Sequence, residues 1–354
     1  MKFCSSFAAL LLMLVAGATT PALAATTSSL TAAPTPASSW CAAGKTVNFA
    51  GLNWESGAFL TELMRYLLEH GYGCKTDAIP GNSVAMEVAL SKNDIQVFAE
   101  EWIGRSSAWR DAVKAQKVVG VGNIVIGAVE GWYVPDYVIQ GDVRRGIKAS
   151  APGLKSVTDL PRYKDVFKDE EEPAKGRFLN CPTGWTCQGV NSQKLKAYGL
   201  LDSYVNFRPG TGPALDGAIA SAVQRGKPVL FYYWSPTTLM GRYKFIRLEE
   251  PAYTEQCWDT LISPNNPKPC GSAAPPNILQ VGLSRVFYDA DPVLTQMLSK
   301  MTLPIATLNQ LLAEREQKKL TAATQVQNFL KQHPQVWQAW MPADVAAKVT
   351  ASLK

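Results

Sequence analysis

The chain has 354 residues, of which 47% are hydrophobic and 18% charged, and its formal net charge is +6 at pH 7. These fractions are those of a soluble globular protein, and the length is enough for two lobes with separate cores. The basic residues are scattered rather than clustered, which excludes a nucleic-acid-binding surface of the usual kind.

The first residues have the pattern of a secretory signal peptide. Lys2 supplies the positive end, residues 7–18 the apolar segment and residues 22–24 a small-x-small cleavage site, so we expect residues 1–24 to be removed. Residues 25–40 are rich in Thr, Ser, Ala and Pro and are expected to form a flexible leader. No later stretch approaches about 20 apolar residues. We therefore expect no membrane insertion, and a soluble protein exported across the inner membrane to the periplasm.

Strands alternate with helices in the first part of the mature chain. Apolar residues lie on one helical face between Phe59 and Leu68, and this helix is expected to begin after Ser56 and to stop at Gly71. A second helix is expected at 84–90, and strands at 46–52, 95–99 and 123–129. This alternation predicts an α/β lobe, in which ligands bind at the carboxyl ends of the strands.

A second lobe is expected from residue 136 to about residue 282. The apolar segment 132–140 is interpreted as a hinge strand, 163–175 as a solvated loop and 278–283 as the return crossing. A helix at 213–225 precedes an apolar strand at 228–234. Residues 292–354 are helical in pattern, and Trp337 and Trp340 are expected to dock on the body of the protein. The first lobe therefore comprises 41–135 and 283–354, with hinges near 135–142 and 278–283.

Six of the seven cysteines follow the signal peptide, and an even number in an exported protein indicates disulfides. Six cysteines allow fifteen pairings. Sequence proximity favours two pairs and leaves a third by elimination: Cys181–Cys187, Cys257–Cys270 and Cys41–Cys74. A zinc site is the alternative, but the spacings are not those of metal knuckles and histidine is nearly absent. We expect no metal.

Four tryptophans fall at predicted strand ends: Trp54, Trp102, Trp185 and Trp234. Each alone is better explained by core packing than by ligand binding. Trp185 lies in the loop closed by Cys181 and Cys187, where a proline and a glycine restrict its direction. Four tryptophans in one topological place indicate an aromatic cage for a quaternary ammonium group.

A cage alone does not account for tight binding. Three cation–π contacts contribute about 2–6 kcal/mol, whereas micromolar affinity needs about 8 kcal/mol. A ligand with an anionic end could gain the rest from the backbone N–H groups of Thr186 and Cys187, or from Arg105.

Catalytic motifs are absent from the sequence. Its two histidines, His70 and His333, have no plausible Ser or Cys partner, and there is no zincin motif, P-loop or Rossmann fingerprint. We therefore expect neither enzymatic activity nor a cofactor.

The chain resembles the substrate-binding proteins of glycine-betaine and choline-type ABC importers, from about Val47 to Trp340. The resemblance is carried by Glu101-Trp102, by the Asn-Cys-Pro-x-Gly-Trp-x-Cys loop at 180–187 and by Phe-Tyr-Tyr-Trp-Ser-Pro at 231–236. It implies a type II periplasmic-binding fold, in which two α/β lobes joined by a hinge close over a ligand in the cleft between them.

The resemblance also implies roles for single residues. Trp102, Trp185 and Trp234 would box the trimethylammonium group, and the amides of Thr186 and Cys187 would hold a ligand carboxylate. The family histidine four residues after the first box tryptophan is replaced by Ser106, beside Arg105.

An acidic residue after the first strand marks the choline-binding branch of the family. Trp54 and Glu55 loosely match that arrangement. Together with Glu100 and Glu101, Glu55 would suit a ligand more cationic than betaine, although a solvated or salt-bridged loop explains each of them singly.

The function expected from these features is that of a monomeric receptor, which delivers a small cationic or zwitterionic ligand to an ABC permease and its ATPase. Glycine betaine, choline, proline betaine, carnitine and a different amine all remain open as ligands. A ligand sensor on the same fold is one alternative. An exported enzyme acting on choline-like substrates is the other, and the shortage of histidine argues against it.

Overall fold

The computed structural model describes residues 37–354, so the expected signal peptide and residues 25–36 of the expected leader lie outside the described part. The body of the protein begins slightly earlier than expected. Helix α1 (Ser39–Ala42) buries Trp40, whose Nε1 donates a hydrogen bond to the carbonyl of Thr46 at 3.0 Å. Residues 37–40 therefore belong to the fold and not to a leader.

The first sheet has six strands in the order β11-β4-β10-β3-β1-β2. Strand β10 runs antiparallel to both of its neighbours, whereas β1 is parallel to β2 and β3. The strands are β1 (Thr46–Leu52), β2 (Lys75–Gly81), β3 (Val97–Trp102), β4 (Val118–Ile126), β10 (Leu279–Ser284) and β11 (Leu303–Pro304).

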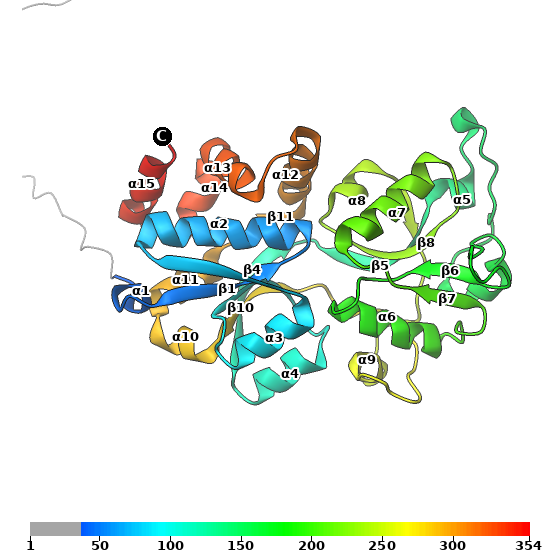
Figure 1. Cartoon of the computed structure of the whole chain (residues 1–354), viewed down its shortest axis with the longest axis horizontal. Coiled ribbons are helices and arrows are strands. Elements are labelled where there is room, and N and C mark those ends of the chain that lie inside the picture. Colours follow the sequence, from blue (N-terminus) through cyan, green and yellow to red (C-terminus); the bar gives the residue numbers. More distant parts are fainter. Residues whose placement is uncertain (1–36) are drawn as a thin grey trace, which may run out of the picture. The chain divides into compact units, whose positions relative to one another are not determined.

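Helices cover both faces of this sheet. Helix α2 (Glu55–Tyr72) lies on one face, with α13 (Ala322–Gln332) and α15 (Ala343–Ser352) packed against it, while α3 (Ser83–Ser91) and α4 (Ser107–Lys114) lie on the other (Figure 1). The remaining helices of this part are α10 (Arg285–Ala290), α11 (Pro292–Lys300), α12 (Ile305–Lys318), α14 (Pro334–Trp337) and a 3-10 turn at Gln338–Trp340.

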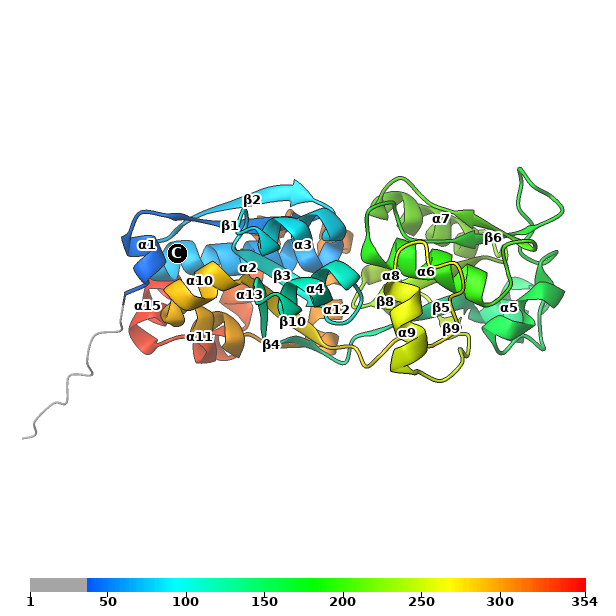
Figure 2. The same cartoon turned by 90° about the horizontal axis from the view of Figure 1, so that it is seen from below.

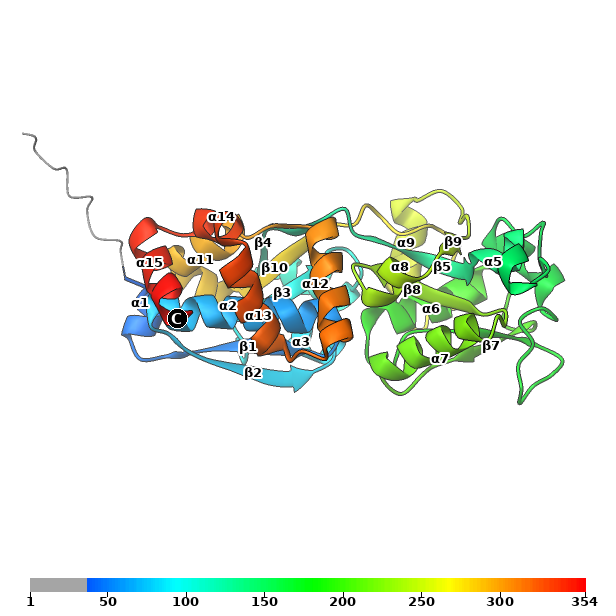
Figure 3. The same ribbon diagram turned by 90° about the horizontal axis from the view of Figure 1, so that it is seen from above.

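The second sheet has five strands in the order β7-β6-β8-β5-β9. They are β5 (Val129–Pro135), β6 (Gly176–Leu179), β7 (Tyr204–Phe207), β8 (Leu230–Ser235) and β9 (Phe245–Arg247). Its helices are α5 (Asp136–Gln140), α6 (Thr186–Ala197), α7 (Gly212–Gln224), α8 (Thr238–Arg242) and α9 (Glu255–Ile262), with 3-10 turns at Val143–Arg145 and Val157–Tyr163. Helices α6 and α9 lie on one face of this sheet and α7 and α8 on the other (Figure 1). Figure 2 views the molecule from the side of α6 and α9, and Figure 3 from the side of α7 and α8.

The α/β prediction is confirmed, and the predicted strand at 46–52 coincides with β1. The hinge prediction is wrong in detail. Residues 129–135 form a strand that pairs with β8 and β9, and a helix follows at once, so 132–140 lies inside the second sheet's unit. Strand β10 belongs to the first sheet, so 278–283 is not a hinge either. The chain passes between the sheets at 127–128 and again in the segment between 248 and 278.

Each sheet has its own apolar core. Trp337 and Trp340 are buried in the first core, which confirms that the C-terminal helices dock on the body. Strand β2 was not foreseen, because it alternates between half-buried and exposed residues at the sheet edge and contains Pro80, which only an edge strand tolerates. No helix among residues 37–354 is both long and apolar enough to cross a membrane.

Three disulfides join the six cysteines in the two pairs that sequence proximity favours and in the third pair that elimination leaves. They are Cys181–Cys187, Cys257–Cys270 and Cys41–Cys74, with sequence separations of 6, 13 and 33. The shortest of them fixes the segment directly before α6, where Trp185 is the N-cap residue.

Candidate ligand-binding site

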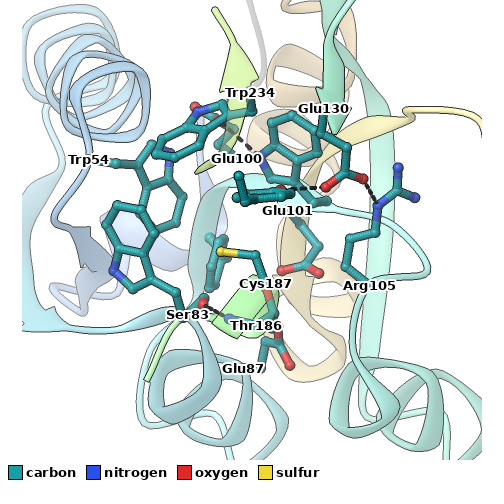
Figure 4. Close-up of a pocket in the computed structure, with 14 residues that line it drawn as sticks. Trp54, Ser83, Glu87, Glu100, Glu101, Arg105, Glu130, Thr186, Cys187 and Trp234 are labelled. Atoms are coloured by element: carbon teal, nitrogen blue, oxygen red, sulfur yellow. Dashed lines mark hydrogen bonds and ion pairs between the residues drawn. The ribbon is translucent and has the colours of Figure 1, made fainter. Parts of the chain in front are cut away.

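A pocket lies where several strands of both sheets end, as expected for an α/β fold. The space between its side chains is about 510 Å³, part of which opens to solvent. It is lined by Trp54, Ser83, Glu87, Phe98, Glu100, Glu101, Trp102, Arg105, Glu130, Trp185, Thr186, Cys187, Tyr232 and Trp234 (Figure 4).

All four tryptophans predicted from strand ends line this pocket. The centroid of the Trp185 ring lies 5.8 Å from that of Trp54, and the two ring planes are inclined by 69°. The corresponding values for Trp185 and Trp234 are 5.4 Å and 74°. These edge-to-face contacts keep the ring planes steeply inclined to one another instead of stacked. Three indoles at such angles form a concave apolar surface, the shape that a methylated ammonium group requires.

The position of Trp185 is fixed from several directions. Its Nε1 donates to Oδ1 of Asn53 at 2.9 Å, a residue that follows β1 of the first sheet. Gly184 has φ +91°, and a Cβ at this position would lie 2.4 Å from the side chain of Asn82, so only glycine fits there. The disulfide and these contacts together hold the indole in place before any ligand binds.

The first residues of α6 face the same space. The amide of Thr186 donates to Oγ of Ser83 at 3.0 Å, so one of the two amides predicted to hold a ligand carboxylate already has an acceptor. Cys187 is left as the remaining candidate of the pair.

Arg105 lines the pocket but is held by protein groups. Its Nε lies 2.6 Å from Oε1 of Glu130, and its other nitrogens donate to the carbonyls of Ile103 and Pro275, both at 2.9 Å, and to the side chain of Asn277. These four hydrogen bonds use most of the five guanidinium N–H groups. Arg105 is therefore a buried ion-pair partner of Glu130, whereas the sequence offered it as one alternative anchor for a ligand carboxylate.

The partner of Arg105 is kept ionised. Burial by itself would raise the pKa of Glu130, but the charge of Arg105 and the hydroxyl of Tyr232, which donates to this carboxylate, hold the pKa below its ordinary value.

Two other predicted residues lie outside the lining of the pocket. Ser106 is the N-cap of α4, where its Oγ accepts from the amide of Trp109 at 3.3 Å and donates to Glu87. Glu55 accepts two hydrogen bonds at 3.1 Å from the amide and hydroxyl of Thr238, at the start of α8. Ser106 thus positions another acid, and Glu55 joins the two sheets' units.

Three buried carboxyl groups, which we call the acidic wall, face the pocket: Glu87 on α3, and Glu100 and Glu101 at the end of β3. Their exposed fractions are 3%, 0% and 2%. Burial raises the pKa of Glu87 to about 7, although Ser106 and the amide of Trp109 favour its ionised form. Burial likewise raises the pKa of Glu100 to about 7, against the opposing effects of Ser56, Trp102 and Trp54.

Of the three acids, Glu101 has the fewest contacts with protein groups that would stabilise its charge. Burial and the nearby charge of Glu87 raise its pKa well above the ordinary value. Within residues 37–354 its carboxyl group has neither a hydrogen bond nor an oppositely charged partner. On Glu100, Oε1 accepts from Nε1 of Trp102 at 3.0 Å, and the buried Ser56 hydroxyl and Trp54 Nε1, which have no other partner among the described residues, also favour its ionised form. Glu101 is therefore the member of the acidic wall with unused acceptor capacity.

The sequence reasoning missed several pocket residues: Ser83, Glu87, Phe98, Glu130 and Tyr232. For Glu87, a glutamate between apolar neighbours on a predicted helix was the available signal, since acids are rarely buried without a purpose. For Glu130 there was no such signal, because its pairing with Arg105 depends on contacts between segments that are 25 residues apart.

The fold and this pocket define a solute-binding protein, with two α/β units and an aromatic and acidic site at the strand ends. The sequence model of one protein family, described as the substrate binding domain of the ABC-type glycine betaine transport system, matches residues 45–332. The chain belongs to this family, which is one of solute-binding proteins and not of enzymes.

Relatives and solved structures agree with this assignment. The chain is 22% identical to the glycine betaine/proline betaine-binding periplasmic protein of Escherichia coli over 73% of its own length and 78% of that protein. It is 22% identical to the trimethylamine N-oxide-binding protein of Pelagibacter ubique, over 80% and 87% of the two chains. An ABC-transporter choline-binding protein solved with choline superposes with a TM-score of 0.68 at 16% identity, covering 87% of this chain and 98% of that one. The predicted type II periplasmic-binding fold is confirmed.

Proposed function

We propose that this protein is the periplasmic receptor of an ABC importer and that it binds a small quaternary ammonium compound in the pocket described above. The three edge-to-face tryptophans at the strand ends are the observation that carries the proposal. Methyl groups on nitrogen spread the positive charge over an apolar surface, which indole faces attract and water solvates poorly. The named ligands of the relatives, glycine betaine, proline betaine, choline and trimethylamine N-oxide, all belong to this chemical class or share its methylated nitrogen.

The binding cycle that we propose is the closure of two lobes, one around each sheet, over the ligand. Several contacts join the two units beside the pocket: Trp185 to Asn53, Thr186 to Ser83, and Thr238 to Glu55. The only flexible joints that closure needs are the two crossings, at 127–128 and within 248–278. Gly127 has φ +92° and begins the first crossing. Closure would exclude water, so that the cation–π attraction acts in a medium of lower dielectric constant.

The partners in this proposal are an ABC permease and its ATPase, which accept the ligand from the closed receptor. The receptor itself acts as a monomer and makes or breaks no covalent bond. Trp102, Thr186 and Cys187 complete the lining of the pocket, and a bound ligand would contact them in addition to the cage.

The direct test is titration of the mature protein, followed by heat and by tryptophan fluorescence. The panel is glycine betaine, choline, trimethylamine N-oxide and tetramethylammonium, the last of which has nothing but the methylated cation. We expect micromolar binding of at least one member, accompanied by a change in fluorescence, because four tryptophans line the site. Absence of binding across the whole panel would refute the proposed ligand class.

A further inference from the structure

We propose that the acidic wall (Glu87, Glu100 and Glu101) binds the end of the ligand that the tryptophans leave free, and that it selects a hydrogen-bond-donating end, hydroxyl or ammonium, over a carboxylate. This inference rests on the proposed function and narrows it. It assigns Glu101 as the residue that determines specificity, supported by Glu87.

Unused acceptors are the first observation behind the proposal. Glu101 is 2% exposed and lines the pocket, and no hydrogen-bond donor among residues 37–354 reaches its carboxyl group. Buried polar atoms are nearly always hydrogen-bonded in native proteins, so exceptions that face a pocket point to donors supplied from outside.

The balance of charge is the second observation. The charged groups in the pocket lining are four glutamates and one arginine. Arg105 is committed to Glu130, and Lys194, whose charge also acts on Glu130, lies 2.5 Å from Glu250. No base among residues 37–354 forms an ion pair with the acidic wall. Figure 4 shows Glu101 among the drawn side chains, with the Arg105–Glu130 pair to its right and Trp54 to its left.

A ligand carboxylate in this place would face carboxyl groups instead of cations. Binding of such a carboxylate would require the acids of the wall to stay protonated, and the ligand would lose most of its hydration. A hydroxyl or ammonium group instead donates to Glu101, and a hydrogen bond to an ionised acceptor is among the stronger ones available to a protein. The quaternary end of the same ligand adds a positive charge that partly neutralises the wall.

The protonation of the wall is consistent with this selection. Burial keeps the pKa of Glu87 and Glu100 near 7, and burial together with the nearby charge of Glu87 raises the pKa of Glu101 well above its ordinary value. Several titratable and polar groups face these acids. They are Arg105, which follows β3, Glu130 on β5, Ser106 and the amide of Trp109 at the start of α4, and Ser56, Trp54 and Trp102. A bound cation lowers all three pKa values, so binding of a cationic ligand releases protons.

Three probes that differ only at one end separate the contributions. Tetramethylammonium reports the cage alone, choline adds a hydroxyl end, and glycine betaine adds a carboxylate end. By calorimetry at pH 7.5 we expect the wild-type protein to bind choline at least tenfold more tightly than glycine betaine. In Glu101→Gln we expect choline binding to weaken about tenfold and glycine betaine binding to strengthen, because the amide keeps the shape but removes the charge.

Glu55→Gln is the matched control, since Glu55 lies near the pocket but is bound to Thr238 outside the lining. It should shift the affinities for choline and glycine betaine by the same factor. The inference is overturned if the wild-type protein prefers glycine betaine, or if Glu101→Gln leaves the ratio of the two affinities unchanged. Both outcomes leave the proposed function intact, whereas failure of all three probes to bind would refute the proposed function and this inference together. The wild-type ratio decides the matter even if the variant does not fold.

Discussion

The aromatic side of the pocket and its acidic wall are built in different ways. Trp185 is fixed by a disulfide loop and by neighbouring indoles, and it is neutral, so its burial needs no counter-charge. Glu101 is equally buried but carries a group that burial opposes, with no cation to balance it. The aromatic side thus resembles ordinary protein interior, whereas the acidic wall is complete only with a ligand. The difference indicates that the tryptophans supply general affinity for a methylated cation and that the acids supply selectivity.

A second comparison within the acidic residues makes the same point. Glu130 and Glu101 line one pocket, yet the pKa of Glu130 is lowered and that of Glu101 is raised. The reason is Arg105, which pairs with the first at 2.6 Å and not with the second. Glu130 is therefore part of the scaffold, and Glu101 is left for the ligand.

The largest effect on the free energy of unfolding is expected from replacing Arg105, the cation that pairs with Glu130. Arg105→Met leaves a buried carboxylate unpaired and should lower the free energy of unfolding by about 3–5 kcal/mol, measured by urea denaturation at pH 7.5. Because the folded-state pKa of Glu130 is lowered, the contribution of its ionised form is present above its ordinary pKa and is lost as the pH falls through the lowered value. The difference between wild type and variant should therefore shrink in acid.

Arg285→Met is the control for this experiment. Arg285 pairs with Asp289 on the surface at 2.8 Å, and exposed pairs contribute little to stability. Equal losses in the two variants would show that the Arg105–Glu130 pair is no more structural than a surface pair, and would remove the distinction between Glu130 and Glu101.

Truncation of the central tryptophan tests the aromatic side. Trp185→Ala removes one cation–π contact and the ring that connects Trp54 to Trp234, which should weaken ligand binding by about 2–3 kcal/mol, or roughly 30- to 150-fold. Calorimetry with choline and with tetramethylammonium should show similar losses, since both carry the methylated cation. Trp340→Phe, in the first core and away from the pocket, should leave both affinities unchanged. A folded Trp185→Ala protein with wild-type affinity would rule out the cage.

The aromatic side could be predicted from the sequence and the acidic wall only in part. Trp185 and Trp234 follow local patterns, a short disulfide loop and a continuous apolar strand, and the ends of parallel strands meet at one edge. The protein contacts of Arg105, Ser106 and Glu55 could not be predicted because each depends on a distant partner. The guanidinium of Arg105 meets Glu130, 25 residues further along, and Glu55 meets Thr238, 183 residues away.

The same contrast holds for the fold. Strand β1 and the buried face of α2 follow from local periodicity, and the structure reproduces them. The passage between sheets at 127–128 could not be located, because β4 and β5 are both apolar and only two residues separate them. Which sheet a strand joins is decided by pairing with β8 or β10, and no local pattern encodes that choice.

Disulfide removal should separate stability from binding. Replacing Cys181 and Cys187 by serine opens a loop of 6 residues and should cost about 2 kcal/mol of stability in the chain-entropy model, together with a several-fold loss of affinity because Trp185 is released. Replacing Cys257 and Cys270 opens a loop of 13 residues outside the pocket lining and should cost about 3 kcal/mol without a change in affinity. Thermal unfolding and calorimetry of the two double variants provide the comparison. If both variants lose affinity equally, the short loop has no special part in holding the cage.

The smallest expected effect is the pH dependence of binding, and it distinguishes the acidic wall from the aromatic side. Glu87 and Glu100 hold protons up to pH about 7 in the ligand-free protein, whereas their ordinary pKa is 4.5. Their contribution to the free energy of unfolding is therefore fully present below pH 4.5 and is lost as the pH rises through 7. A cation binds better to the ionised acids, so the affinity for choline should rise by about tenfold between pH 6 and 8 for each proton released.

Choline does not titrate between pH 6 and 8, so the change of its affinity with pH reports the titration of groups in the protein. In Glu87→Gln one titrating group is gone, and the rise should be correspondingly smaller, while the heat of binding should depend less on the ionisation enthalpy of the buffer. Trp185→Ala should bind more weakly at every pH but keep the wild-type slope, because an indole has no proton to release. A wild-type affinity that falls with rising pH would mean that the protonated acids donate to the ligand, and it would assign to the wall an anionic or oxide end instead of a donor.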